Sequence, residues 1–170
     1  VLMARFKTKL LLLSDTREGL PLEFKQGAFD EVLEECLPFG DYHCQLKYGE
    51  SVTEQMTIPI AFERKSLSDL WGTLTDKVRI ERLKQRCKQA KEAGFQFFLI
   101  MESSMREVAD GYSYSTIGGD QIIKTIFTFW VKHDLIPMFC GDRRTMARFI
   151  EETFNSVARN YKAEPEPEAA

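Results

Sequence analysis

Hydrophobic and polar positions along this chain follow two periods, and each period predicts a different kind of element. Short apolar runs and alternation at every second residue predict strands, whereas apolar positions three and four apart predict helices. The expected strands cover residues 9–14, 42–48, 56–63, 95–101 and 136–139. The expected helices cover residues 28–37, 79–93, 120–131 and 144–161, with one further short helix after Ser66. This order predicts an α/β domain with a mixed central sheet and helices on both faces.

The composition is that of an ordinary globular domain. The chain has 170 residues, of which 44% are hydrophobic and 29% charged, and its formal net charge is −3. This charge disfavours a sequence-blind DNA coat, although a local basic patch can still bind DNA. The longest apolar run, at residues 10–13, is far too short to span a membrane. We expect one folded domain over residues 1–162 and a disordered acidic, proline-containing tail over residues 163–170.

The four cysteines are scattered rather than paired in sequence. No two of them have the CxxC spacing of a zinc site, and isolated thiols are typical of a reducing compartment. We therefore expect an intracellular protein, placed in the nucleus of a eukaryote or in the cytoplasm if its source is microbial or viral. The cysteines are Cys36, Cys44, Cys87 and Cys140.

The strands at 42–48 and 56–63 are expected to form a hairpin that brings two carboxylates together. Asp41 opens the first of these strands and Glu63 ends the second, so antiparallel pairing places them side by side. Carboxylates are the ligands that Mg²⁺ prefers, and the backbone carbonyl of Arg64 offers a third oxygen. Lys65 lies on the same side of the strand as Glu63 and can serve the attacking water or the phosphate. The pattern therefore predicts metal-assisted phosphodiester hydrolysis.

Three separated motifs give the chain a family resemblance, although an acid-x-lysine pattern alone is common. In this order and spacing the chain resembles the nuclease domain of the XPF/Mus-type structure-specific endonucleases, a branch of the restriction-endonuclease-like fold. The resemblance is clear over residues 10–102. The motifs are Asp15-Thr16-Arg17-Glu18, Gly40-Asp41-Tyr42 and Glu63-Arg64-Lys65-Ser66-Leu67-Ser68-Asp69-Leu70.

The resemblance assigns roles to individual residues. It implies that Asp41 and Glu63 bind Mg²⁺, which Mn²⁺ can replace, while Lys65 acts on water and phosphate. Asp15 would support the positioning of metal or water. The residues that would complete the polar network or contact DNA are Arg17, Glu18, Arg64, Asp69 and Arg79.

Some of these residues also have simpler explanations. Arg64 could pair with Asp15 or Asp69 and simply hold the site together. Asp69 also lies three residues after Ser66, where it completes a variant of the helix capping box. Arg79 could be a solvated helix residue.

The implied function is a metal-dependent DNA endonuclease that cuts branched DNA (flaps, forks or junctions) in repair or recombination, as a homodimer or heterodimer. The alternative is a non-catalytic DNA-binding or scaffold subunit, which usually lacks a metal carboxylate or the lysine. A restriction enzyme or junction resolvase of the same broad fold is a third reading. The chain departs from the family in two respects. Many members have a glutamine in the stretch that reads Ile80-Glu81-Arg82-Leu83 here. The tandem helix-hairpin-helix module of the family is not recognised after the nuclease motifs.

Other charged and aromatic groups have open assignments. Two basic runs are each read as a solvated helix face, with phosphate contact as the alternative; they are Lys84, Arg86, Lys88, Lys91 and Arg143, Arg144, Arg148. His43 is expected to point away from the site. Phe127, Phe129 and Trp130 are expected mainly in the core, with an exposed remainder at a dimer face together with the last helix.

Overall fold

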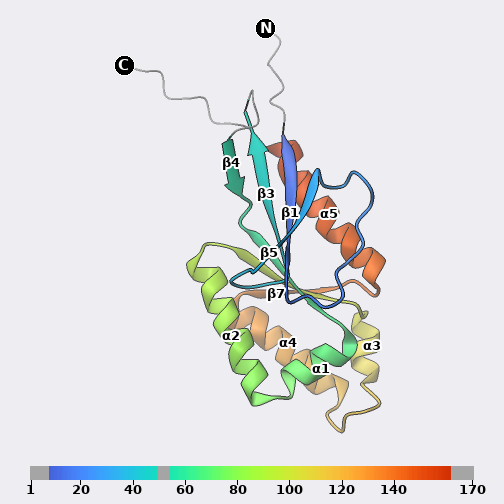
Figure 1. Cartoon of the computed structure of the whole chain (residues 1–170). Helices are drawn as coiled ribbons and strands as arrows, with labels where there is room; N and C mark the ends of the chain where they lie inside the picture. Colours follow the sequence, from blue (N-terminus) through green and yellow to red (C-terminus); the bar gives the residue numbers. More distant parts are fainter. Residues whose placement is uncertain (1–7, 50–53, 162–170) are drawn as a thin grey trace.

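The computed structural model, which describes residues 8–49 and 54–161, is built around one mixed sheet with helices on both sides (Figure 1). The strands are β1 (Lys9–Asp15), β2 (Glu31–Glu35), β3 (Tyr42–Tyr48), β4 (Glu54–Thr57), β5 (Ile60–Lys65), β6 (Gln96–Met101) and β7 (Leu135–Phe139). The helices are α1 (Leu67–Leu74), α2 (Lys77–Glu92), α3 (Met105–Asp110), α4 (Gly119–His133) and α5 (Arg143–Asn160). The predicted α/β class with a mixed central sheet is confirmed.

The strand order places the two ends of the predicted site next to each other. The sheet runs β2-β1-β3-β5-β6-β7, and β4 pairs with β3 outside this path. Strand β3 is antiparallel to β1, β4 and β5, whereas the β1–β2, β5–β6 and β6–β7 pairs are parallel. Because β3 begins where β5 ends, the residues that precede β3 and follow β5 meet at one edge.

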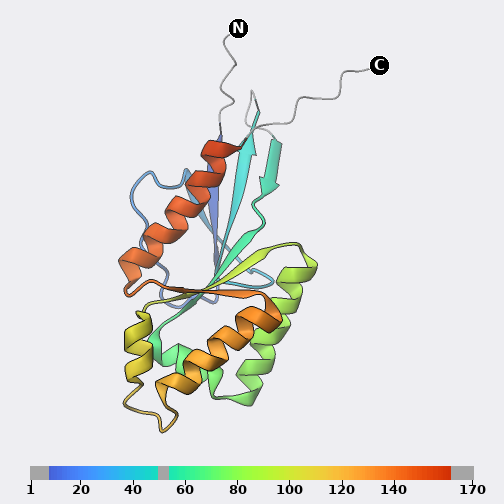
Figure 2. The same cartoon turned by 180° about the vertical axis from the view of Figure 1, so that it is seen from behind.

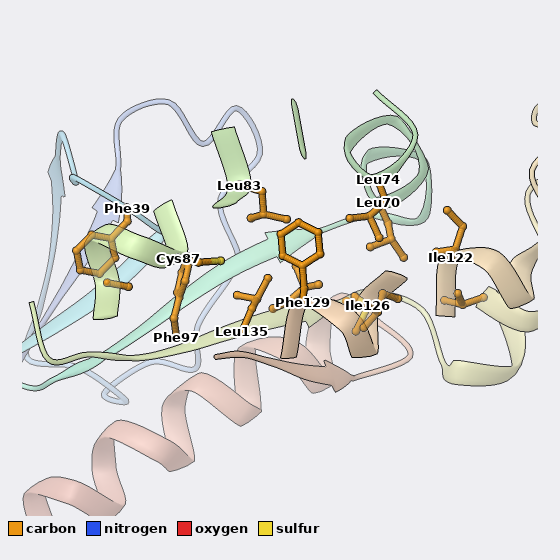
Figure 3. Close-up of a cluster of buried hydrophobic side chains, with 14 of the residues drawn as sticks. Phe39, Leu70, Leu74, Leu83, Cys87, Phe97, Ile122, Ile126, Phe129 and Leu135 are labelled. Atoms are coloured by element: carbon orange, nitrogen blue, oxygen red, sulfur yellow. The ribbon is translucent and has the colours of Figure 1, made fainter. Parts of the chain in front are cut away.

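Two hydrophobic cores form on opposite faces of the sheet. Helices α1, α2 and α4 cover one face, and α5 covers the other, as the two opposite views show (Figures 1 and 2). Phe129 and Leu83 belong to the first core (Figure 3). Strand alternation divides neighbours between the cores, since Ala61 faces the first and Phe62 packs against Phe154 of α5 in the second.

The predicted helix at residues 28–37 is wrong, because this segment contains β2. All five residues of β2 are exposed, including Val32 at 55%, so the apolar spacing builds no buried helix face. Instead β2 pairs in parallel with β1, and Asp30 exchanges backbone and side-chain hydrogen bonds with Leu10 at its start. The free edge of β1 thereby gains hydrogen-bond partners for its backbone, which outweighs the local helical pattern.

The predicted strand at residues 56–63 pairs as expected but is not continuous. Pro59 has no N–H for the ladder, and a local hydrogen bond of 2.7 Å from the N–H of Ile60 to the carbonyl of Ile58 breaks the strand into β4 and β5. Both parts pair with β3, so the predicted pairing is confirmed. Most of the joining turn lies outside the described residues.

The remaining helices follow the predictions with small shifts and one addition. Ser66 caps α1 by accepting a hydrogen bond from the N–H of Asp69, as its spacing predicts. Helix α2 begins two residues earlier than predicted because Asp76 caps it, and the short α3 was not predicted at all. The proposed tail at 163–170 lies outside the described residues. Within the described residues, no helix is both long and apolar enough to cross a membrane.

Candidate active site

Asp41 is held at the sheet edge by its own backbone. Its N–H donates to the carbonyl of Phe62 at 2.6 Å, and its carbonyl accepts from the N–H of Asp15 at 2.9 Å. The preceding Gly40 has a φ of 68°, and a Cβ there would lie 3.0 Å from the carbonyl oxygen of Phe62. Only glycine fits this close left-handed turn without strain. The turn therefore fixes Asp41 between β1 and β5.

Glu63 lies beside Asp41 and is almost completely buried, with a residue exposure of 1%. Its Oε1 accepts hydrogen bonds at 2.7 Å from Lys65 Nζ and from Arg86 Nη1. Its Oε2 also accepts from Arg86 Nη1, at 2.9 Å. The two cations compensate a carboxylate that would otherwise be costly to bury. The predicted same-side arrangement of Glu63 and Lys65 is confirmed.

The Asp41 carboxyl differs from Glu63 because it lacks full compensation. One oxygen, Oδ2, accepts from the N–H of Arg64 at 2.7 Å, while Oδ1 has no hydrogen-bond partner among the described residues. Burial, and next the negative charge of Glu63, raise the pKa of Asp41 well above its usual range, although Lys65 and Arg64 oppose the rise. A divalent cation would relieve this repulsion, so the donor set fits a metal ion.

This fit rests on two side-chain carboxylates and not on a larger cage. Among the described residues, no group of three or more His, Cys, Asp or Glu side chains is arranged to hold a metal ion. Such a sparse set suits Mg²⁺, which commonly keeps several waters and uses one or two carboxylates. The backbone carbonyl of Arg64 stays a predicted third ligand.

Asp15 forms a second cluster on the neighbouring strand end. Its Oδ1 accepts from the backbone N–H of Arg17 at 2.8 Å and from the side-chain Nε at 2.7 Å; its Oδ2 accepts from Arg17 Nη2 at 2.6 Å and from the N–H of Leu37 at 2.9 Å. Burial acts against ionisation, but these hydrogen bonds outweigh it and lower the pKa of Asp15 to about 2.

Arg64 joins two further carboxylates of the site, Glu18 and Glu102. Its Nε and Nη2 reach the two carboxylate oxygens of Glu18 at 3.2 and 2.8 Å, and its Nη1 bonds to Glu102. The alternative pairing of Arg64 with Asp15 or Asp69 is therefore wrong. Glu102 also accepts from Arg143 Nη1 at 3.0 Å, which links this part of the site to α5.

These groups surround a pocket of about 530 Å³ at the end of the sheet. It contains every predicted site residue except Arg79, whose Nη1 lies instead beside Gly72 of α1. His43 points away, as expected, and bonds to the carbonyl of Phe39 at 2.8 Å. The residues lining the pocket are Asp15, Arg17, Glu18, Gly19, Leu20, Asp41, Glu63, Arg64, Lys65, Ser66, Asp69, Arg86, Glu102 and Arg143.

Sequence reasoning gave Arg86, Glu102 and Arg143 no place in the site. The sequence does contain an indication for two of them, Arg86 and Glu102. Arg86 sits within three or four residues of the buried Leu83 and Ala90, so it shares the inward face of α2. Glu102 directly follows β6, which is parallel to β5, and carboxyl ends of parallel strands share an edge.

The family assignment follows from a comparison with protein families. The family model of the ERCC4 domain matches residues 14–153. The chain belongs to the ERCC4 domain family. The match spans all three motifs and the two predicted metal-binding carboxylates, Asp41 and Glu63, so the predicted resemblance to an XPF-type nuclease domain is confirmed.

Solved structures agree with the ERCC4 assignment at the level of the fold. XPF from Aeropyrum pernix is 21% identical with a TM-score of 0.58, and the match covers 88% of this chain and 63% of that one. XPF from Aeropyrum pernix in complex with DNA is 18% identical with a TM-score of 0.55, covering 91% and 68%. The chain thus spans about two thirds of the length of these structures. No curated protein gives a significant match.

Proposed function

We propose that this ERCC4 domain is a metal-dependent endonuclease that hydrolyses phosphodiester bonds in branched DNA during repair or recombination. The observation that carries the proposal is the juxtaposition of Asp41 and Glu63, with Lys65 hydrogen-bonded to Glu63, in the lining of the pocket. The family supports a nuclease. The similarity to a structure described as XPF in complex with DNA supports DNA as the substrate.

In this proposal Asp41 and Glu63 hold Mg²⁺, or Mn²⁺ in its place, with the carbonyl of Arg64 as a further ligand. When bound, such an ion polarises a phosphoryl oxygen as a Lewis acid. Lys65 brings a positive charge to the pocket, where it stabilises the charge that develops on the phosphate. Arg86 holds the Glu63 side chain in position through its two contacts. Asp15 and Glu18 anchor Arg17 and Arg64 at the pocket wall.

The deciding experiment is cleavage of end-labelled flap, fork and plain duplex DNA with Mg²⁺ and with EDTA. We expect cutting of the branched substrates in Mg²⁺ and none in EDTA. If none of the substrates is cut in Mg²⁺ or Mn²⁺, the proposed endonuclease activity is wrong. Binding of the ion is measured separately, as the rise in melting temperature on adding MgCl₂ to wild type and its loss in Asp41→Asn.

A non-catalytic DNA-binding or scaffold subunit is the second candidate. One observation favours it, namely that Glu63 already accepts three hydrogen bonds from Lys65 and Arg86, which compete with a metal ion for the same oxygens. The presence of Asp41, Glu63 and Lys65 together favours the enzyme. DNA binding without cutting, and without a Mg²⁺-dependent melting shift, would identify the scaffold.

Dimer formation is a further part of the proposal. On α4, Trp130 is 45% and Val131 79% exposed, whereas Phe129 is buried in the core. The ring of Phe127 contacts that of Trp130, with centroids 5.9 Å apart. Sedimentation velocity over a range of concentrations tests the dimer, and a Trp130→Glu variant should shift the protein towards monomer.

A further inference from the structure

Helices α2 and α5 each carry a run of basic residues, and the two runs differ in whether their side chains have carboxylate partners. On α2, each lysine of the run has a carboxylate partner of its own. The pairs are Lys84–Glu81 at 2.6 Å, Lys88–Glu92 at 3.8 Å and Lys91–Asp134 at 2.7 Å. These pairs reduce the attraction of the α2 face for a polyanion, which supports the reading of this face as solvated surface.

The first two turns of α5 carry two arginines without an ion-pair partner among the described residues. Arg144 and Arg148 are exposed, and neither guanidinium has a carboxylate within ion-pair distance among the residues that the structure describes. The capping carboxylate of Asp142 accepts from the N–H of Thr145 at 2.7 Å, and it attracts the charge of Arg144 from beyond ion-pair distance. Residues four apart lie on one face of a helix, about 6 Å apart along its axis. The two guanidinium groups therefore form a short positive row.

This row borders a groove of about 820 Å³ between α5 and the β1–β2 connection. Figures 1 and 2 show that connection beside α5. Two of the carboxylates in the groove are already engaged. Glu151 accepts from the N–H of Lys25 at 2.5 Å, and Glu152 pairs with Arg159 at 3.4 Å. Only Glu152 has a cationic partner among the described residues, so Glu23 and Glu151 keep their negative charge. Lys25, Arg144 and Arg148 have no ion-pair partner there, so the groove still presents more free positive than free negative charge.

Arg143 connects this groove to the candidate active site, because it lines both. Its Nη1 bonds to Glu102 in the active-site pocket. Its Nη2 donates to the carbonyls of Leu20 and Pro21 at 3.1 and 2.9 Å, which fixes the β1–β2 connection against α5. A chain that leaves the active-site pocket past Arg143 would enter the groove directly.

We propose that this groove binds the phosphate backbone of a DNA strand leading away from the active-site pocket, with Arg144 and Arg148 contacting successive phosphates. The inference rests on the proposed function and adds the path of the substrate. Guanidinium groups match phosphate oxygens in charge and geometry and can bind them in a bidentate way. Contacts of this kind set position and affinity without reading sequence.

The test measures binding of a fluorescently labelled forked DNA by anisotropy in EDTA, at several KCl concentrations. The double variant Arg144→Gln/Arg148→Gln is compared with the control Lys88→Gln/Lys91→Gln, which removes the same charge from α2. Loss of two phosphate contacts should lower the slope of log K against log[salt] by about 1.4–1.8, and the affinity by about 10-fold at moderate salt. The control should stay within about 2-fold of wild type.

A further variant, Arg144→Lys/Arg148→Lys, keeps the charge and should retain most of the salt slope. Thermal unfolding checks that all variants fold. If the α5 and α2 variants bind equally, or if neither differs from wild type, the groove is not the path and the inference is overturned while the endonuclease proposal stands. If wild type neither binds nor cuts any DNA, the proposed function fails first.

Discussion

Asp15 and Asp41 lie at neighbouring strand ends in one pocket, yet their surroundings are opposite. Asp15 accepts four hydrogen bonds, which lower its pKa to about 2. Asp41 accepts one at its side chain and lies next to the buried Glu63, which together with burial raises its pKa. Two aspartates at neighbouring strand ends thus differ, because the carboxylate of Asp15 has hydrogen-bond partners for both oxygens and that of Asp41 does not.

The difference suggests a division of labour. A carboxylate whose oxygens are all occupied stabilises the fold, here by tying the β1 end to the N–H of Leu37 and to Arg17. A half-buried carboxylate with a free oxygen and a like charge beside it, such as that of Asp41, costs stability, and such groups gather at functional sites. On this view Asp41 and Glu63 form the reactive centre and Asp15 forms part of its support.

The largest expected effect is on cutting. Asp41→Asn and Glu63→Gln should each reduce the cleavage rate on forked DNA by at least about 10³-fold, roughly 4 kcal/mol, because each removes a proposed metal ligand. Single-turnover kinetics measures the rate, and anisotropy in EDTA confirms that binding is retained. Near-normal cutting by either variant would show that the metal ligands are assigned wrongly.

The next effect is on stability and concerns Asp15. Asp15→Asn should lower the free energy of unfolding by about 2–3 kcal/mol, because it weakens several hydrogen bonds to a charged, buried group. Urea denaturation followed by circular dichroism measures it. Arg17→Gln is the matched control and should cost less, since the Arg17 side chain is 57% exposed. If the urea midpoint of Asp15→Asn equals that of the wild type, the interpretation that the hydrogen bonds of Asp15 stabilise the fold is wrong.

The free energy of unfolding at acidic pH should also depend on the carboxylate of Asp15. The pKa of Asp15 falls from 3.8 to about 2 on folding, so its contribution is complete above pH 4 and is lost as the pH falls towards 2. The loss amounts to up to about 2 kcal/mol. Urea denaturation of wild type and Asp15→Asn across this range should converge at low pH. Parallel curves would mean that Asp15 is not held in its charged form.

The smallest expected effect is that of Asp41→Asn on the free energy of unfolding, and it does not destabilise the protein as Asp15→Asn does. In EDTA, Asp41→Asn should leave the free energy of unfolding unchanged or raise it by about 1 kcal/mol, because it removes a charge repelled by Glu63 and penalised by burial. The same urea titration detects the difference. If Asp41→Asn instead destabilises the protein by 2 kcal/mol or more, as expected for Asp15→Asn, the proposed difference between the carboxylates of Asp15 and Asp41 is wrong.

Much of the fold and of the site was predictable from local pattern. The strands at β1, β3, β6 and β7 follow directly from their apolar runs and alternation, and the cap at Ser66 follows from residue type and spacing. The hairpin rule placed Asp41 beside Glu63. The local pattern failed at residues 28–37, where pairing with a free strand edge decided the structure, and at Pro59, which interrupts a strand that its neighbours favour.

The sequence by itself determined which groups meet at the candidate site, because strand alternation and hairpin pairing are local rules that bring Asp41, Glu63 and Lys65 to one edge. Only the tertiary structure decided how each charge is compensated. Arg86 reaches Glu63 from α2, 23 residues away, and Arg143 reaches Glu102 from α5, 41 residues away. Such pairings depend on how helices pack on the sheet, which no periodicity records. The electrostatic state of each carboxylate, and the groove beside α5, therefore appear only in the folded molecule.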